Sequence, residues 1–265
     1  MKIVILGMGH MGSWLTKELL REHEVAVYDI DERKSEGLSN IFRLHHPREI
    51  EGYRPELLIN AVSLQHTVAA FEETLRYLPK NCIIGDVASI KGEIADYYSR
   101  GGFKFASVHP MFGPTFANMK ILKEENGVII SESCEDGRDF FNRLFTRLGL
   151  RIFEYSFEEH DSMMAYSLTV PFVASMMFAG CVDAKAVPGT TFKRHMKIAR
   201  NLLSEDDHLL AETLFNPHSV AQLGRMTSQL QYLKHIITGK DFEVAREFFA
   251  KLRENIGEQP SSPEN

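Results

Sequence analysis

The stretch Lys2-Ile-Val-Ile-Leu-Gly-Met-Gly-His-Met-Gly12 decides the fold of this chain. Its short apolar run predicts a buried strand, and the helical spacing from Met11 to Glu22 predicts a helix directly after it. The glycines between them follow the pattern Gly-x-Gly-x-x-Gly. Gly7 permits a tight turn, Gly9 lets the backbone approach a pyrophosphate, and Gly12 lets the helix pack closely on the strand. This stretch therefore predicts a Rossmann-type dinucleotide site.

The second predicted strand, 24–28, is followed by Asp29, which lies 17 residues past Gly12. A carboxylate at this place can accept hydrogen bonds from ribose hydroxyls and would repel a 2′-phosphate. We therefore expect NAD as the cofactor, with NADP less favoured, although Arg33 and Lys34 could weaken that preference. The predicted cofactor-binding residues are Gly7, Met8, Gly9, His10, Met11, Gly12, Asp29, Val62 and Ser63.

Val62 and Ser63 belong to this set because they follow a predicted strand at 57–61 on the same side of the sheet. A plain strand-to-helix turn is the alternative for them. His10 lies within the glycine turn, and its side chain could simply point to solvent.

The rest of the chain divides into two parts. Apolar strands alternate with helices up to about residue 155, which predicts a doubly wound parallel sheet of α/β Rossmann type. Beyond that point only helical spacing is found, which predicts an all-α domain. We expect a Rossmann domain at 1–155, a helical substrate and dimerisation domain at 156–257, and a flexible tail or linker at 258–265.

Composition narrows the class of protein. The net charge is −6, and basic residues form no long run, so we expect no nucleic-acid partner. The three cysteines are far apart and show neither a disulfide framework nor metal-ligand spacing, which suits the cytoplasm and predicts no metal site. The most apolar stretch, 168–181, is expected to be a buried helix rather than a membrane span.

Two segments follow predicted strands at the edge of the sheet where ligands gather. One is Asp86-Val-Ala-Ser89-Ile-Lys91, and the other begins at His109-Pro110. Proline holds the preceding histidine in an extended conformation, and an imidazole there can deprotonate a hydroxyl as a hydride leaves the same carbon. Ser89 could hold that hydroxyl or the nicotinamide amide. The alternatives are a buried histidine bonded to backbone and a helix-capping serine.

The ordered set of motifs resembles the prephenate and arogenate dehydrogenases. It comprises Gly-x-Gly-x-Met-Gly at 7–12, Asp-x-x-Ser-x-Lys at 86–91, His-Pro-Met-Phe-Gly at 109–113 and Glu-His-Asp at 159–161. The resemblance implies NAD-dependent oxidative decarboxylation of prephenate to 4-hydroxyphenylpyruvate on the tyrosine pathway. It also implies that His109 hydrogen-bonds the ring hydroxyl and that Ser89 helps to orient it. Sequence alone does not separate prephenate from arogenate.

The resemblance further implies an arginine near the ring carboxylate. Arg200 best fits that place, and Lys197 shares roughly its helix face; Arg194 lies nearby, and a solvated basic face is the alternative. Many relatives carry Ser-His-Leu-Pro in the first long helix, where this chain reads Ser167-Leu-Thr-Val-Pro171. Thr169 is therefore expected to take the place of that histidine in substrate binding.

Several further expectations follow. The family implies a homodimer through the helical domain, and the polar tail suggests a fused or associated chorismate mutase. We interpret His160 as a helix cap or interdomain contact rather than a catalytic group. One rival function is a β-hydroxyacid dehydrogenase that uses Lys193 or Lys197, and another is a non-catalytic NAD-sensing module.

Overall fold

The structure is a computed structural model that describes residues 1–112, 122–183, 185 and 187–257. Gly113 of the histidine segment and the predicted tail at 258–265 lie outside these described residues.

One sheet of eight strands forms the first part of the chain, in the order β3-β2-β1-β4-β5-β6-β7-β8. Neighbouring strands are parallel except for β6 and β7, which are antiparallel. The predicted α/β class with a doubly wound sheet is confirmed. The strands are β1 (Lys2–Leu6), β2 (Glu24–Tyr28), β3 (Phe42–Arg43), β4 (Leu57–Asn60), β5 (Ile83–Asp86), β6 (Phe105–Pro110), β7 (Asn126–Ile130) and β8 (Arg151–Tyr155).

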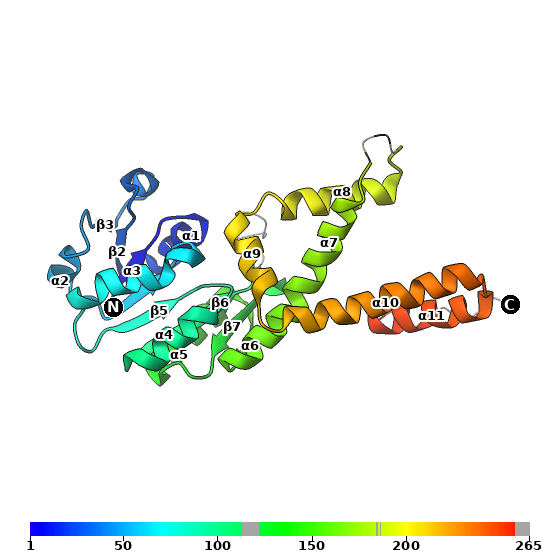
Figure 1. Cartoon of the computed structure of the whole chain (residues 1–265). Coiled ribbons are helices and arrows are strands. Elements are labelled where there is room, and N and C mark those ends of the chain that lie inside the picture. The colour runs from blue at the N-terminus through cyan, green and yellow to red at the C-terminus, as the bar shows by residue number, and fades with distance from the viewer. Residues whose placement is uncertain (113–121, 184, 186, 258–265) are drawn as a thin grey trace.

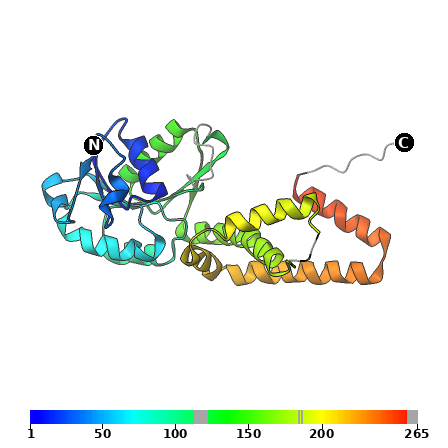
Figure 2. The same cartoon turned by 90° about the horizontal axis from the view of Figure 1, so that it is seen from above.

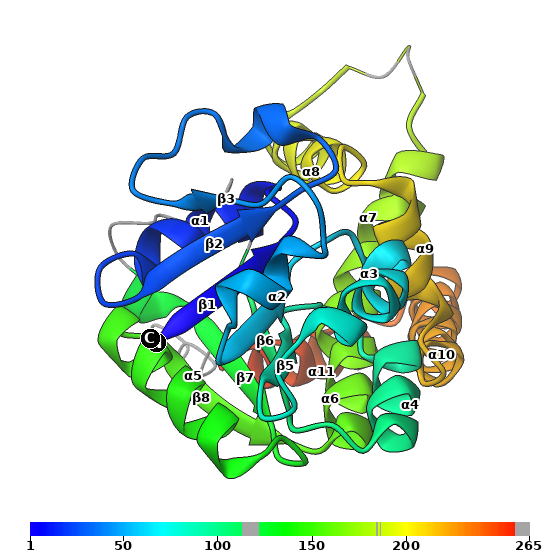
Figure 3. The same cartoon turned by 90° about the vertical axis from the view of Figure 1, so that its left-hand side faces the viewer.

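Helices cover both faces of this sheet (Figure 3). Its central strands are therefore buried on both sides. Helices α1 and α5 pack on one face through Trp14, Leu15 and Phe141. Helices α2, α3 and α4 pack on the other, where Phe71 and Tyr98 are buried. These helices are α1 (His10–Leu19), α2 (Glu49–Tyr53), α3 (Thr67–Thr74), α4 (Gly92–Gly101) and α5 (Glu135–Leu148).

The second part of the chain is helical (Figure 1). Figure 2 shows the sheet at one end of an elongated molecule and these helices at the other. Helices α7 and α8 leave the sheet as one arm, and α10 with α11 forms a second arm (Figure 1). The helices are α6 (Phe157–Met164), α7 (Val170–Gly180), α8 (Thr190–Leu202), α9 (Asp207–Phe215), α10 (Ser219–Gly239) and α11 (Phe242–Asn255).

Shorter helical segments complete the fold. A π-helical turn joins α6 to α7, and Pro171 follows it at the start of α7. Proline has no N–H to offer to the preceding turn, which explains the change of register there. The short segments are the 3-10 turns η1 (Glu32–Ser35), η2 (Leu64–His66), η3 (Leu75–Tyr77) and η4 (Leu122–Glu124) and the π turn η5 (Ala165–Thr169).

The expectation of a buried helix at 168–181 is wrong for the single chain. None of the residues of α7 is buried, and Met177 is 57% exposed. By length and composition, the helical stretch Phe157–Gly180 could cross a membrane, and only 22% of its most apolar window is buried. This apolar stretch is therefore largely exposed in the single chain.

Candidate active site

The glycine turn between β1 and α1 has the geometry that its sequence predicts. Gly7 adopts φ +85°, and a Cβ on it would lie 2.8 Å from the carbonyl oxygen of Ala61. A Cβ on Gly12 would collide with the carbonyl oxygen of Gly7. Both positions therefore require glycine, because the backbone of β4 and the start of α1 approach the turn closely.

Asp29 ties the second strand to this turn. Its carboxylate accepts hydrogen bonds from the backbone N–H of Met8 at 2.6 Å and of Asp31 at 2.8 Å. Lys34 Nζ lies 3.5 Å from Oδ1 of the same carboxylate. Asp29 is thus held beside the glycine turn. The cation next to it is Lys34, which could weaken the preference for NAD over NADP.

A cavity of about 420 Å³ opens beside the turn, lined among others by Gly7, Gly9, Asp29, Val62 and Ser63. A Cβ placed on Gly9 would meet no atom within 4 Å, so the space above this residue is open to a ligand. A glycine turn at a helix N-terminus with a carboxylate beside it suits the pyrophosphate and ribose of a dinucleotide. The residues present therefore fit this cofactor.

The other predicted cofactor residues take different places. Met8 is buried and contributes its backbone N–H, whereas His10 is exposed at the start of α1 and lines neither cavity. Met11 lines a second cavity instead. Val62 and Ser63 line both cavities, so the two spaces adjoin at the end of β4.

The second cavity, about 600 Å³, lies between the sheet and the helices. From the sheet it is lined by Ser89 and His109, the two residues predicted to be catalytic. The structure thus brings Ser89 and His109 together in one space that adjoins the nucleotide cavity. From the helical part of the chain it is lined by Leu168, Phe172, Asn201, Leu202, Glu205, Asp206, His208, Leu209 and Thr213.

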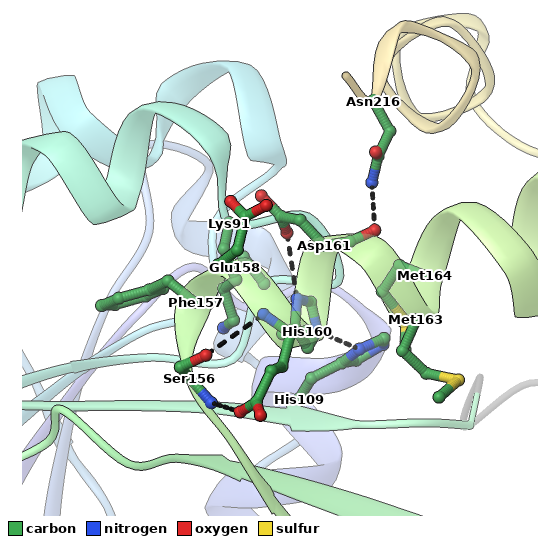
Figure 4. Close-up of polar contacts among 12 residues, drawn as sticks. Lys91, His109, Ser156, Phe157, Glu158, His160, Asp161, Met163, Met164 and Asn216 are labelled. Carbon is green, nitrogen blue, oxygen red and sulfur yellow. Dashed lines mark hydrogen bonds and ion pairs between the residues drawn. The ribbon is translucent and has the colours of Figure 1, made fainter. Parts of the chain in front are cut away.

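Sequence reasoning missed the partner of His109. Nδ1 of His109 lies 3.1 Å from Nε2 of His160, and Nδ1 of His160 lies 3.1 Å from Oδ1 of Asp161 (Figure 4). Burial lowers the pKa of His109 well below its ordinary value, and His160 and Lys91 lower it further. Burial also lowers the pKa of His160, although Asp161 opposes the change.

His160 reaches this place because the start of α6 is capped. The hydroxyl of Ser156 accepts from the backbone N–H of Glu159 at 3.2 Å, and the Glu159 carboxylate accepts from the backbone N–H of Ser156 at 2.8 Å. This capping box fixes the first turn of the helix. The cap of this helix is therefore formed by Ser156 and Glu159. The side chain of His160 is buried and takes no part in the cap.

The lysine of the Asp-x-x-Ser-x-Lys motif also has a role that its sequence did not reveal. Lys91 is fully buried and donates to Asp86 at 2.6 Å and to the carbonyl oxygen of Val108 at 2.8 Å. Tyr98 donates to the other carboxylate oxygen of Asp86 at 3.0 Å. Burial lowers the pKa of Lys91, and Asp86 opposes the change. This cluster joins the end of β5, where Asp86 lies, to β6, which carries His109.

The predicted substrate-binding residues are not gathered in the cavity. Arg194, Lys197 and Arg200 are exposed on α8 and lie outside the described cavity lining, and so does Lys193. Thr169 is buried, and its hydroxyl is hydrogen-bonded to the Thr213 carbonyl at 3.2 Å and to the Ser219 hydroxyl at 2.8 Å. Thr169 thus contributes to the packing between helices. Its predicted contact with the substrate stays a prediction.

No family model matches the chain. Two relatives are similar over most of its length. Arogenate dehydrogenase 2 of Arabidopsis thaliana, a chloroplastic protein, is 22% identical over 91% of this chain and 71% of its own. A probable arogenate/prephenate dehydrogenase of Methanocaldococcus jannaschii is 20% identical over 94% of this chain. The chain spans only 58% of the length of that second relative.

The fold points the same way. The structure of prephenate dehydrogenase from A. aeolicus, in complex with hydroxyphenyl propionate and NAD+, superposes with a TM-score of 0.81. The identity is 17%, and the match covers 97% of each chain. By sequence and by fold, this chain is similar to the arogenate and prephenate dehydrogenases.

Proposed function

We propose that this chain oxidises and decarboxylates prephenate with NAD as the hydride acceptor, giving 4-hydroxyphenylpyruvate and carbon dioxide. The observation that carries the proposal is the shared cavity of Ser89 and His109, which adjoins the cavity beside the glycine turn. A nicotinamide that extends from the glycine turn would enter the same space as these two side chains. NAD is favoured over NADP because Asp29 stands at the ribose end.

The chain's own groups supply the proton chemistry. His109 takes the proton of the substrate's ring hydroxyl, and Ser89 orients that hydroxyl beside it. When bound, NAD would supply the acceptor for the hydride of the hydroxyl-bearing carbon, and the glycine turn with Asp29 would hold it. The bond between the ring and its carboxylate breaks in the same reaction, carbon dioxide leaves, and the electrons of that bond make the ring aromatic. The proton held by His109 then returns to the phenolate oxygen. The apolar residues Leu168 and Phe172 line the cavity and limit water around the ring.

One observation favours arogenate as a second candidate. Glu205 and Asp206 line the cavity, and the described lining holds no lysine or arginine. Arogenate carries an ammonium group where prephenate carries a keto group, so carboxylates in the cavity would attract it. The similarity to the Arabidopsis thaliana arogenate dehydrogenase supports the same alternative.

The test is NADH formation by the purified chain with NAD, using prephenate and arogenate in parallel and NADP as a second acceptor. We expect turnover with NAD and one of the two substrates, and 4-hydroxyphenylpyruvate or tyrosine as the product identifies which. Turnover with arogenate alone would replace prephenate as the substrate, and absence of turnover with both, while NADH binding is demonstrated, would overturn the proposal. In that case 3-hydroxyisobutyrate is the next substrate to test.

We also propose that two copies associate through the helical part. Large apolar side chains are exposed on its two arms, and an exposed apolar surface of this extent is typical of a subunit contact. Light scattering on the purified chain should give twice the 30.2 kDa of one copy. A monomeric mass would contradict the proposal. The residues include Met177 of α7, Leu223, Leu230 and Ile237 of α10, and Phe242, Phe249 and Leu252 of α11.

A further inference from the structure

His160 connects the candidate catalytic histidine to a carboxylate. Its side chain is fully buried, and each of its ring nitrogens has a partner: Nε2 faces Nδ1 of His109, and Nδ1 faces Oδ1 of Asp161 (Figure 4). The row Asp161–His160–His109 thus runs from a partly exposed carboxylate to the cavity that His109 lines. A helix cap would not require either contact.

Hydrogen-bond chemistry fixes where the hydrogens lie in this row. An ionised carboxylate only accepts, so Asp161 requires the hydrogen of His160 on Nδ1. A neutral His160 then presents Nε2 as an acceptor, and the hydrogen between the rings must come from Nδ1 of His109. Since a neutral imidazole carries one hydrogen, His109 is left with an unprotonated Nε2.

The surroundings of both rings favour their neutral forms. Burial holds the pKa of each histidine below its ordinary value. Charged groups from three elements face the pair. Asp161 lies on α6, the buried Asp86 ends β5, and the buried Lys91 lies in the segment before α4. Lys91 disfavours a second positive charge on either ring, and the two carboxylates favour the charged form of His160.

The protein holds this row in place from both sides. The backbone N–H of His160 donates to the Ser156 carbonyl at 2.8 Å within the capped first turn of α6. The side-chain amide of Asn216 donates to the carbonyl oxygen of Asp161 at 2.8 Å. The residue after α9 therefore anchors the backbone of Asp161, and the capping box anchors the first turn of α6, in which His160 lies.

We infer that His160 and Asp161 are positioning residues that hold His109 as the tautomer whose Nε2 accepts the substrate's hydroxyl proton. This inference rests on the proposed function and names no contact between His160 and substrate. When the proton arrives at Nε2, His109 keeps its Nδ1 hydrogen bond to His160. Asp161 then lies at the far end of the row and offsets the new positive charge. An aspartate that fixes the tautomer of a catalytic histidine is known to matter in this way in serine proteases.

The first test is Asp161→Asn. The amide can donate to Nδ1 of His160, which allows both rings to reverse their tautomers and places a hydrogen on Nε2 of His109. We expect kcat to fall at least about tenfold, with the substrate KM and NADH binding unchanged. Glu158→Gln is the matched control, because it removes a carboxylate that pairs with His218 on the exposed side of the same helix. Equal kcat in the two variants would overturn the inference.

A second pair of variants separates positioning from packing. Gln at position 160 offers a carbonyl oxygen near the place of Nε2 and can accept from His109, whereas Leu cannot. We expect His160→Gln to keep several times more activity than His160→Leu, with an unchanged pH profile. Equal loss of kcat in both would contradict a role in setting the tautomer.

The tautomer can also be read without turnover. Nitrogen-15 spectra of histidine-labelled protein distinguish protonated from unprotonated ring nitrogens, and His109→Asn assigns the signal. We expect an unprotonated Nε2 on His109 in the wild type and a protonated one in Asp161→Asn. A protonated Nε2 in the wild type would overturn the inference. A wild type that turns over neither substrate would overturn the proposed function, and the spectra would still decide the tautomer.

Discussion

The ammonium of Lys91 lies 2.6 Å from a carboxylate oxygen of Asp86, and neither side chain is accessible to solvent. Lys91 also donates to the carbonyl oxygen of Val108, the residue before His109. Asp86 ends β5 and Val108 lies in β6, so this contact fixes the backbone of two neighbouring strands where they meet the cavity. Lys91, the lysine of the Asp-x-x-Ser-x-Lys motif, thus stabilises the backbone next to the cavity and does not contact a ligand.

Lys91→Met should therefore destabilise the protein. Removing one partner of a buried ion pair leaves an uncompensated charge, which costs about 3–5 kcal/mol. The measurement is the free energy of unfolding in urea. Lys104→Met is the control, because Lys104 pairs with Asp136 at the surface. A loss no larger than that of the control would show that the buried pair contributes little.

His109→Asn should abolish most of the proton transfer. Asparagine cannot take the hydroxyl proton, and general base catalysis contributes about 100-fold or more. We expect kcat to fall by at least that factor while NADH binding, measured by fluorescence, stays the same. A rate close to that of the wild type would remove His109 from the mechanism.

Asp29→Asn should weaken the cofactor site. Hydrogen bonds to a charged group contribute about 1.5–3 kcal/mol, so we expect affinity for NAD to fall about 10- to 100-fold. The ratio of kcat/KM for NAD to that for NADP should also fall, because the repulsion of a 2′-phosphate is lost. Asp31→Asn is the control, since Asp31 pairs with Arg33 at the surface. An unchanged ratio would contradict the assigned role of Asp29.

Arg200→Ala tests the predicted carboxylate ligand. Its neighbours Asn201 and Leu202 line the cavity, although Arg200 itself is exposed. We expect the substrate KM to rise about tenfold, because a charge-assisted hydrogen bond is lost, while the KM for NAD stays constant. Lys193→Ala serves as the control on the same helix. An unchanged substrate KM would move the carboxylate site to Lys197 or Arg194.

Acid should destabilise the protein through its buried histidines. The pKa values of His109 and His160 are lowered in the folded chain and return to about 6.5 on unfolding. Below pH 6.5 the unfolded chain therefore binds more protons than the folded one, so stability is lost as the pH falls through that range. Above about pH 7 both states carry neutral rings, and these groups have no effect.

The measurement is the melting temperature between about pH 7.5 and 5.5. The double variant His109→Asn with His160→Gln should show a shallower decline than the wild type. His45→Gln, which changes an exposed histidine, should not. Parallel declines in the wild type and the double variant would assign the acid sensitivity to other groups.

Local patterns were sufficient for much of the sheet. Strands such as β1 and β2 are continuous apolar runs beside turn signals, so the pattern predicts them without reference to distant residues. The sequence pattern does not predict the short edge strand β3 or the strand β8. β3 has two exposed residues, and β8 is only half-buried, so neither carries the apolar run that identifies a central strand.

The amino-acid sequence by itself determined the fold class, the glycine turn with Asp29, and the presence of a histidine and a serine at strand ends. Each of these depends on spacing within a short segment, where backbone sterics and strand direction leave few alternatives. Only the tertiary structure decided that His109 meets His160, 51 residues later in the chain, and that Lys91 is buried against β6. It also placed the basic residues of α8 at the surface and left α7 uncovered. Contacts of this kind depend on how separate helices pack, and packing is set by the whole set of side chains rather than by any local pattern.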